Sequence, residues 1–417
     1  MRSFLFVIFF LIGLQNFLFV QSRSVRKNSF NVLHHGAVGD GIHDDTKAFM
    51  DAWEHTCNYM GSKSTMEIPR GKTFLLQPIE FNGPCKSKKI FFRIDGDLTA
   101  PKLPHKWRCE NHKCDKWIGF GHLNGLYIDG RGTLDGQGRK WWSLNCKHDK
   151  IACQRRPRGI IIAHSNNVHV SNVNVKDSPN FQMSFESSRW VYVKDITITA
   201  DGDSPNTDGI HLQRSQNVFI SDSVIQTGDD CISIGDGSKH VNISKISCGP
   251  GHGISIGSLG RNGNKEAVES VYVRDSTFRS TTNGVRIKTW QGGKGHVRNV
   301  VFEHITFHES SRPIIIDQYY CPHSHCKNHT SAVRISDITY RHIHGTSDEK
   351  ASVQLLCSET VPCRNIYMSD INLYTTRKEN DRSSRDDHGS LSECINARGL
   401  SNGIVRPRVP CLRAERH

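Results

Sequence analysis

The sequence predicts an all-β fold, a solenoid of short parallel strands closed at its N-terminal end by a short helix. Three-residue runs with apolar first and third positions recur from residue 168 onwards, about every 23 to 33 residues. Ser, Asn, Asp and Gly are common between the runs, as expected for turns. Like residues return at like positions, which favours a parallel solenoid over an antiparallel sandwich. The runs lie at 168–170, 191–193, 218–220, 241–243, 271–273, 300–302, 333–335 and 366–368.

One further segment precedes this repeat domain. Residues 1–22 are predicted to be a secretory signal peptide, because Arg2 is followed by a mostly apolar run over residues 4–20 and by small residues near Ser22. A signal anchor is the alternative, but the run is shorter than the roughly 20 apolar residues that a membrane span needs. Residues 23–417 contain no Pro- or Ser-rich linker. We therefore expect a single domain that grows by adding turns.

The predicted capping helix follows a glycine-rich turn at residues 36–41. Asp44, Asp45 and Thr46 are expected to cap a helix that runs to about Cys57. Such a segment often covers the open end of a solenoid. The turn lacks the strand-then-helix context of a GxGxxG loop, so it is a poor candidate for phosphate binding.

Four polar clusters concentrate the candidate chemistry. Each is a polar turn that leads into a short β-branched run, at 206–211, 228–233, 251–256 and 285–288. Successive turns of a solenoid lie about 4.8 Å apart, so these clusters should converge on one patch. The patch would contain Asp208, Asp229, Asp230, His252, Arg286 and Lys288.

Three carboxylates beside an imidazole and two cations suit acid–base hydrolysis of a glycosidic bond. One carboxyl group protonates the leaving oxygen while another activates water or attacks. Crowding separates the pKa values of carboxyl groups, so that one can stay protonated. Arg286 and Lys288 leave the same face of a strand and would suit a substrate that carries carboxylates.

Each of these residues also has a plainer explanation. An Asp beside Gly often bonds the backbone of its own turn, and two cations on a strand can form a solvated face. Adjacent aspartates can also bind a metal, but calcium sites normally need more oxygen ligands than two aspartates supply. The four clusters at one phase of a repeat favour a shared site, and we expect no metal in it.

The segments NTDGIH, GDDCISIG, GHGISIGSLG and RIK, in this order, resemble the four signature segments of polygalacturonases, the pectin-hydrolysing enzymes of glycoside hydrolase family 28. The similarity covers most of the mature chain, including DGRGTLDG at 129–136. It implies that residues 23–417 form a right-handed parallel β-helix and one catalytic domain. It also implies hydrolysis of the α-1,4 bonds of polygalacturonan with inversion, without a cofactor.

The resemblance assigns roles to two groups of residues. The catalytic group consists of Asp229 as the general acid, Asp208 and Asp230 as the pair that positions and deprotonates water, and His252 as support. The substrate-binding group consists of Asn206, Arg286, Lys288 and Tyr320. Tyr319 competes with Tyr320 for the last role.

Charge and compartment indicate the class of partner. The formal net charge is +13, and the sequence pI is about 9.1. Such a protein attracts polyanions. A signal peptide and the lack of a recognisable nucleic-acid motif argue against nucleic acid. We expect a secreted monomer without a membrane partner after signal cleavage, acting in the cell wall on an acidic polysaccharide, homogalacturonan.

The fourteen cysteines predict disulfides in a secreted chain. Asn242 and Asn328 begin acceptor sequons for N-glycosylation. The cluster CPHSHC at 321–326 could instead bind zinc, but an oxidising compartment favours a disulfide there. The expected local pairs are Cys57–Cys85, Cys109–Cys114, Cys146–Cys153, Cys231–Cys248, Cys321–Cys326, Cys357–Cys363 and Cys394–Cys411.

A basic, aromatic insert at 101–117 departs from the strand pattern. It is either a solvated loop or a platform on which Trp107 or Trp117 stacks against a sugar ring. No motif of the resembled family covers this segment.

Several functions compete for this sequence. The first is endo-acting polygalacturonan hydrolysis, with carboxyl groups about 6.5 to 9.5 Å apart as in inverting enzymes. Exo-acting hydrolysis, a calcium-dependent pectate lyase on a similar β-helix and a rhamnogalacturonan hydrolase are the enzymatic alternatives. A pectin-binding wall protein with a decayed site is the non-enzymatic one, although the complete set of aspartates argues against decay.

Overall fold

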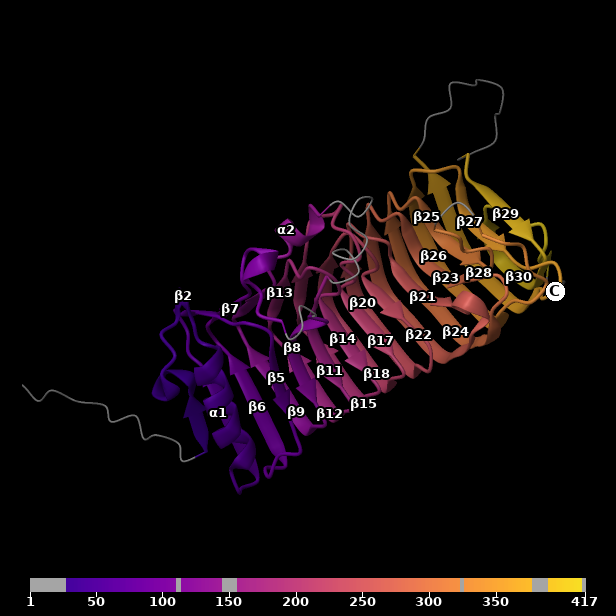
Figure 1. The fold of residues 1–417 in the computed structure, drawn as a ribbon. Coiled ribbons are helices and arrows are strands. Elements are labelled where there is room, and N and C mark those ends of the chain that lie inside the picture. Colours follow the sequence, from indigo (N-terminus) through magenta and orange to yellow (C-terminus); the bar gives the residue numbers. More distant parts are fainter. Residues whose placement is uncertain (1–27, 110–113, 145–155, 323–325, 377–388, 415–417) are drawn as a thin grey trace, which may run out of the picture.

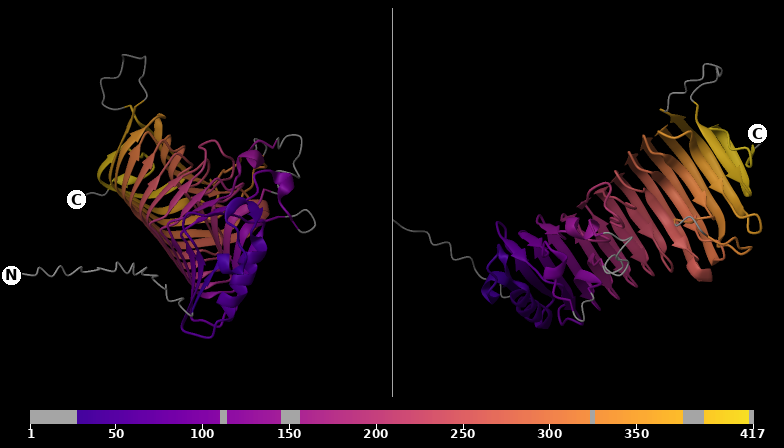
Figure 2. Two further views of the ribbon diagram at one scale, coloured as in Figure 1. Left: turned by 90° about the vertical axis from the view of Figure 1, so that its left-hand side faces the viewer. Right: turned by 45° about the horizontal axis from the view of Figure 1, so that its top comes forward.

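The protein is an elongated solenoid whose turns follow one another along a single axis (Figures 1 and 2). The computed structural model describes residues 28–109, 114–144, 156–322, 326–376 and 389–414. The predicted signal peptide, the Cys146–Cys153 pair and the charge-dense segment near residues 377–387 lie outside these ranges. None of the helices in the described ranges is long and apolar enough to cross a membrane.

The described strands form two sheets, and every strand pairing between turns is parallel. The smaller sheet contains β5 (Ile79–Asn82), β8 (Lys116–Gly121), β11 (Arg158–Ala163), β14 (Met183–Glu186), β17 (Ile210–Gln213), β19 (Ile232–Ile234), β21 (Ile254–Leu259), β23 (Asn283–Thr289), β25 (Arg312–Asp317), β27 (Ala351–Leu356) and β29 (Leu391–Ile395). This sheet carries the candidate site.

The larger sheet forms the rest of the wall, and all eight predicted alternating runs lie in it or at the start of one of its strands. Its strands are β1 (Ser29–Asn31), β2 (Asp40–Asp44), β3 (Lys63–Ile68), β4 (Thr73–Leu75), β6 (Lys89–Ile94), β7 (Asp97–Thr99), β9 (Asn124–Gly130), β10 (Thr133–Asp135), β12 (Asn166–Ser171), β13 (Asn174–Lys176), β15 (Arg189–Lys194), β16 (Thr197–Thr199), β18 (Gln216–Gln226), β20 (Lys239–Cys248), β22 (Lys265–Arg279), β24 (Lys294–His308), β26 (Arg334–Ser347), β28 (Cys363–Thr375), β30 (Ala397–Arg406) and β31 (Arg413–Ala414).

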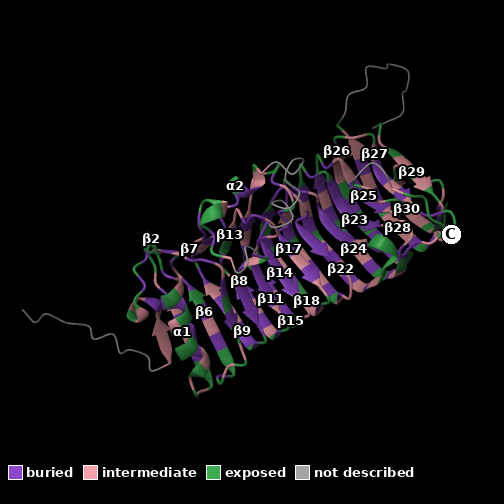
Figure 3. Cartoon of the chain, viewed as in Figure 1, coloured by how far each residue is buried: buried purple, intermediate pink, exposed green. Residues whose placement is uncertain are grey.

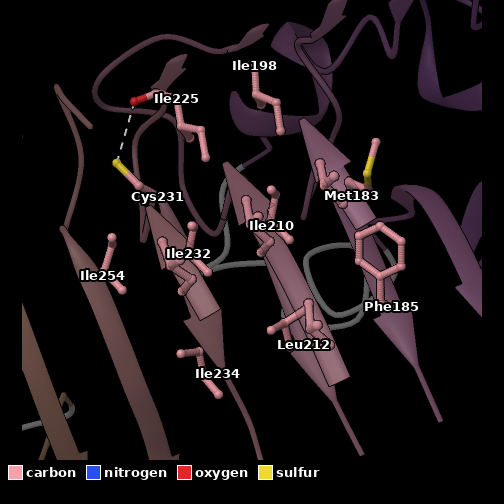
Figure 4. Close-up of a cluster of buried hydrophobic side chains, with 14 of the residues drawn as sticks. Met183, Phe185, Ile198, Ile210, Leu212, Ile225, Cys231, Ile232, Ile234 and Ile254 are labelled. Atoms are coloured by element: carbon pink, nitrogen blue, oxygen red, sulfur yellow. Dashed lines mark hydrogen bonds between the residues drawn. The ribbon is translucent and has the colours of Figure 1, made fainter. Parts of the chain in front are cut away.

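The core consists of columns of like side chains that run along the solenoid (Figure 4), and buried residues recur on the strands of successive turns (Figure 3). In the smaller sheet Ile210 pairs with Ile232, and Ile232 pairs with Ile254. The column continues through Val285 and Ile314, and all five side chains are buried. Because one side chain of each strand stacks on its counterpart in the next turn, the repeat fixes the register of every strand that carries the site.

The predicted capping helix is confirmed as α1 (Thr46–Asn58). Trp53 of this helix packs against Phe81 with ring centroids 5.3 Å apart, so the helix covers the first turns. The carboxylate of Asp45 accepts hydrogen bonds from the backbone N–H groups of Val38 and Gly39, at 2.7 and 3.1 Å. The backbone N–H groups of the glycine-rich turn therefore donate to a carboxylate of the protein itself.

The remaining helices are short. They are α2 (Arg139–Trp142) and the 3-10 turns η1 (Val32–His35), η2 (Pro104–Lys106) and η4 (Arg261–Gly263). Six of the seven expected disulfides lie in the described ranges, and all six are formed. Cys321 and Cys326 are among them, which excludes zinc binding by these thiols.

The expectation that Trp107 or Trp117 offers an exposed platform for sugar is wrong. Their exposed fractions are 6% and 1%. The indole N–H groups donate to the backbone carbonyls of Pro101 and Leu76, at 2.7 and 2.9 Å. Trp107 also packs edge-to-face against Trp141, with ring centroids 5.5 Å apart. Both rings anchor the insert to the solenoid, because burying their large apolar surface is more favourable than leaving it in contact with water.

Candidate active site

The strand register brings the polar clusters together at the start of neighbouring strands. Asp208, Asp230 and His252 each lie two residues before a member of the Ile210–Ile232–Ile254 column. Backbone hydrogen bonds fix these turns, because Gly209 N–H donates to Asp230 O at 2.9 Å and His252 N–H donates to Asp229 O at 2.8 Å. Neighbouring turns are about 4.8 Å apart, so the predicted convergence is confirmed.

Asp230 is the carboxylate that the protein holds most firmly. Its Oδ1 accepts from Arg286 Nη2 at 2.6 Å and from Ser255 Oγ at 2.8 Å, and its Oδ2 accepts from Lys288 Nζ at 2.8 Å. Burial opposes ionisation of Asp230, but the charges of Lys288 and Arg286 and these hydrogen bonds outweigh it and lower the pKa to about 2. Asp230 is therefore an anion throughout the neutral and mildly acidic range.

Asp208 is in the opposite state. It is buried, and its exposed fraction is 6%. Burial, followed by the nearby charges of Asp229 and Asp230, raises the pKa of Asp208 well above its usual value, against the opposing effects of Ser233 and Lys288. The site therefore retains a proton on its carboxyl groups at a pH where an isolated aspartate has lost it.

Asp229 is the most accessible of the three carboxylates. Its side chain is 18% exposed, and His252 Nδ1 lies 3.0 Å from its Oδ1. The same Oδ1 accepts the backbone N–H of Asp230 at 2.7 Å. His252 thus contacts Asp229, which keeps access to solvent, and the supporting role of His252 stays a prediction.

Arg286 and Lys288 lie on the face of β23 that carries the site, as their spacing predicted. Lys288 Nζ is also 5.5 Å from the ring centroid of Tyr320. The hydroxyl of Tyr319 instead donates to the backbone carbonyl of Cys357 at 3.2 Å. The structure therefore favours Tyr320 over Tyr319 as the tyrosine of this site.

Asn206 lies outside this network of contacts. It occupies the turn before β17 in an exposed position with a φ angle of 57°. Among the described residues, no hydrogen bond joins its side chain to the aspartates. Its role in substrate binding stays a prediction.

The predicted set lacked three residues that line the site: His211, Ser233 and Ser255. His211, Ser233, Ser255 and Arg286 are register partners on four neighbouring strands. His211 Nδ1 lies 2.7 Å from Ser233 Oγ, and the ring stacks on Phe181 with centroids 4.6 Å apart. Counting one residue on from each inward isoleucine would have placed these side chains on the same face as Arg286, which follows Val285.

His211 is held neutral by its surroundings. Burial, and then the charge of Arg158, lower the pKa of His211 to about 4. A neutral imidazole between Phe181 and Ser233 adds no positive charge next to Asp230. The permanent cations that neutralise Asp230 are therefore Arg286 and Lys288.

Metal binding at this site would have to displace existing contacts. Asp229, Asp230 and His252 each have a ligand atom within 4.8 Å of the others, which is compatible with an ion. However, both oxygens of Asp230 already accept from Arg286, Lys288 and Ser255. Two cations on one ligand would repel a metal ion, so a site without metal stays our prediction.

The same sheet has a hollow of about 260 Å³ on the N-terminal side of the aspartates. Gly119, Gly121 and Ala163 contribute to its lining, together with cations that are paired with acids. Lys116 Nζ lies 2.7 Å from Glu80, and Arg158 is bonded to Glu186. The surface that carries the aspartates therefore continues along the solenoid beyond Phe181.

Comparison with known proteins identifies the family. The sequence matches the family described as Glycosyl hydrolases family 28 over residues 57–388. A probable polygalacturonase from Arabidopsis thaliana is 42% identical over 397 residues, which cover 94% of this chain and 86% of the relative. The polygalacturonase QRT2 from the same plant is 40% identical over 381 residues, covering 91% and 84% of the two chains.

Solved structures show the same architecture. A polygalacturonase from Erwinia carotovora aligns with a TM-score of 0.68 at 25% identity, over 86% of this chain and 98% of that one. An exopolygalacturonase from Thermotoga maritima aligns with a TM-score of 0.69 at 20% identity, over 84% and 88%, which supports the fold alone. The predicted parallel β-helix is thus confirmed, and with the family match over most of its length the chain belongs to glycosyl hydrolase family 28.

Proposed function

We propose that this glycoside hydrolase is a polygalacturonase that cleaves α-1,4 bonds between galacturonate residues of de-esterified pectin. The observation that carries the proposal is the Asp230 carboxylate, neutralised by Arg286 and Lys288 beside a crowded carboxyl group that retains a proton. Relatives that span most of this chain bear the name polygalacturonase. Cations beside the aspartates suit a substrate with one carboxylate per sugar residue.

In the proposed mechanism Asp229 donates a proton to the leaving oxygen. Asp229 is more exposed than Asp208, and Asp230 is held as an anion, so Asp229 is the carboxyl group best placed to reach a bound polymer. Asp208 and Asp230 orient and deprotonate the attacking water. Burial and the neighbouring charges favour the protonated form of Asp208, so its part as a base begins once that proton has passed to solvent.

The expected carboxylate spacing differs from the structure for one pair. An oxygen of Asp229 lies within 4.8 Å of an oxygen of Asp230, which is shorter than the 6.5 to 9.5 Å expected. Such a short spacing is usual where a carboxylate attacks the sugar directly. Arg286 and Ser255 bond Oδ1 of Asp230 and Lys288 bonds Oδ2, which leaves a lone pair on Oδ2 for a hydrogen bond from water, and we propose attack by that water with inversion.

We further propose that the enzyme is endo-acting. Hollows lie on both sides of the aspartates, one lined by β8 and β11 and the other beside Tyr320, so a long chain has surface on either side of the cleaved bond. This supports internal cleavage over removal of terminal residues.

Secretion as a monomer to the cell wall completes the proposal. Six disulfides in the described ranges support an oxidising compartment. Glycosylation at Asn242 and Asn328 is proposed from their sequons, and a mass shift after enzymatic deglycosylation would test it. Size-exclusion chromatography coupled to light scattering would test the oligomeric state.

A product assay tests the function directly. De-esterified polygalacturonan is incubated with the protein in the presence of a calcium chelator, and reducing ends, ultraviolet absorbance and product lengths are followed. We expect saturated oligomers of mixed length and, by proton NMR at early times, products whose new reducing ends have the inverted anomeric configuration. Monomer alone would indicate exo action. Unsaturated products that require calcium would instead identify a lyase, and no product from folded protein would contradict the proposal.

A further inference from the structure

A second cavity lies beside Tyr320, past the C-terminal ends of β21 and β23. It has a volume of about 430 Å³, within the range usual for small-ligand sites. Its lining includes Asn262, Trp290, Gln291, Cys326, Lys327 and His329. The lining includes the basic side chains of Lys327 and His329, and its described residues include no Asp or Glu. We call this space the distal cavity.

A series of contacts connects the distal cavity to the aspartates. Lys288 Nζ bonds Asp230 at 2.8 Å and lies 5.5 Å from the ring centroid of Tyr320. The Tyr320 ring packs edge-to-face on Trp290, with centroids 5.4 Å apart, and Trp290 lines the cavity. Asp230 precedes β19, whereas Trp290 follows β23, so the line from the aspartates through Lys288 crosses the sheet obliquely and ends in the cavity.

The walls of the distal cavity are fixed by contacts within the chain. Gly292 N–H donates to the carbonyl of Ser331 at 2.7 Å, which ties the loop after β23 to the loop that carries Lys327. The disulfide of Cys326 with Cys321 anchors the same loop near Tyr320. A pre-formed site loses less entropy on binding than one that must order.

Lys327 is the charged group of the cavity that a ligand can reach most readily. Lys327 is exposed, and among the described residues no acid forms an ion pair with it. The indole Nε1 of Trp290 is buried and has no hydrogen-bond partner within the described part of the chain. The Nε1 atom is enclosed by the chain, so Trp290 can meet a ligand only with its partly exposed ring.

The hollow on the other side of the aspartates shows a contrasting charge pattern. There Lys116 and Arg158 are both paired with acids, through Glu80, Asp115 and Glu186. A galacturonate carboxylate would have to compete with those acids. In the distal cavity no acid among the described residues pairs with Lys327, and the Trp290 ring, with the Arg261 guanidinium 5.6 Å from its centroid, adds aromatic surface.

We propose that the distal cavity is an additional subsite that binds a galacturonate residue beyond the one held by Arg286 and Lys288. This inference rests on the proposed polygalacturonase function. Lys327 pairs with the carboxylate of the residue, and the Trp290 ring contacts the sugar. A substrate gains this binding only if it is long enough to reach the cavity and unesterified at that position.

Binding to an inactive variant tests the subsite apart from turnover. In the Asp229→Asn background, dissociation constants are measured by calorimetry for oligogalacturonates of increasing length. We expect Lys327→Ala to weaken binding of long oligomers about three- to tenfold and to leave short ones unchanged. Trp290→Leu should show the same dependence on length, provided its Tm shows that it folds. Asn328 adjoins Lys327, so all variants are produced in one expression host.

Lys194→Ala is the matched control, because Lys194 is a 63% exposed lysine on β15 of the larger sheet. It removes the same charge and should change no dissociation constant. Equal losses in Lys327→Ala and Lys194→Ala, or a loss in Lys327→Ala that does not depend on length, would overturn the subsite. If the wild type cleaves polygalacturonan but Lys327→Ala binds long oligomers normally, only this inference fails. If the wild type neither cleaves nor binds, the proposed function itself fails.

Discussion

Asp230 and Lys288 are 58 positions apart in the sequence, yet Lys288 Nζ lies 2.8 Å from Asp230 Oδ2. Two strand pairings of the solenoid, β19–β21 and β21–β23, produce this contact. Lys288 therefore has two effects in the proposed function. It keeps Asp230 ionised, and it is placed to bind a substrate carboxylate.

Lys288→Met should change both the pH dependence and the affinity of the enzyme. The pKa of Asp230 is about 2 largely because Lys288 and Arg286 stabilise its anion against burial, so loss of Lys288 should raise that pKa. The acidic limb of the kcat/KM profile should move to higher pH, and KM for polygalacturonan should rise about tenfold. Profiles of wild type and Lys194→Met, measured at constant ionic strength, provide the comparison. An unchanged acidic limb would show that Asp230 does not control it.

Asp229→Asn should lose most activity while keeping the fold. Removal of a general acid typically costs a factor of about 10² to 10⁴ in rate. The matched control is Asp222→Asn, an exposed aspartate of β18 whose partner is Lys245 at 3.5 Å. We expect kcat to fall only in the first variant, with equal Tm values in both. Retained turnover in Asp229→Asn would reassign the acid to Asp208.

Tyr319 and Tyr320 form a natural pair for a substitution experiment. Tyr320 lies next to Lys288 and Trp290, whereas the hydroxyl of Tyr319 bonds the carbonyl of Cys357. Tyr320→Leu should raise KM several-fold with a smaller effect on kcat, and Tyr319→Leu should leave both constants near those of wild type. The reverse result would move the substrate-binding tyrosine to position 319.

The positions of side chains that face the core could be predicted from the sequence, whereas the positions of side chains that face outwards could be predicted only in part. Apolar residues at every second position determined the columns that contain Ile232 and Ile254, and through them the meeting of Asp208 with Asp230. Side chains that face outwards have no apolar period. His211 and Ser233 were therefore missed, and so was the external stack in which His169 lies between Tyr127 and Tyr192, with centroids 4.4 and 4.7 Å apart.

The prediction that Trp107 or Trp117 is exposed failed for a related reason. The insert that contains Trp107 interrupts the repeat, so no register relates it to the neighbouring turns. Its ring is buried because the insert folds back onto Trp141, a contact between segments that share no pattern in the sequence. Carboxylate spacing within the site is likewise set by the turns before β17 and β19, and not by the strand period.

Asp208→Asn should make the protein more stable at neutral pH and inactive. The raised pKa of Asp208 means that the folded state binds its proton more tightly than the unfolded chain. Stability is thus lost as pH rises from the unfolded pKa through the folded one, and Asn removes that loss. Tm should exceed that of wild type at pH 7 and approach it at pH 3. A lower Tm at pH 7 would contradict a destabilising charge at Asp208.

We expect His211 to make the free energy of unfolding change with pH in the direction opposite to that of Asp208. Its pKa is lowered from 6.5 to about 4 by burial and by Arg158, so the unfolded chain binds the proton more tightly than the folded protein. The stability that this shift contributes is complete above pH 6.5 and is lost as pH falls towards 4, by about 3 kcal/mol. His211→Gln, which can still bond Ser233, should therefore flatten the pH dependence of the free energy of unfolding between pH 6.5 and 4. His240→Gln removes an exposed histidine of β20 that has no ion pair among the described residues, and it should leave that dependence unchanged. Guanidinium unfolding at several pH values measures both variants, and equal slopes in His211→Gln and wild type would show that His211 titrates normally in the folded protein.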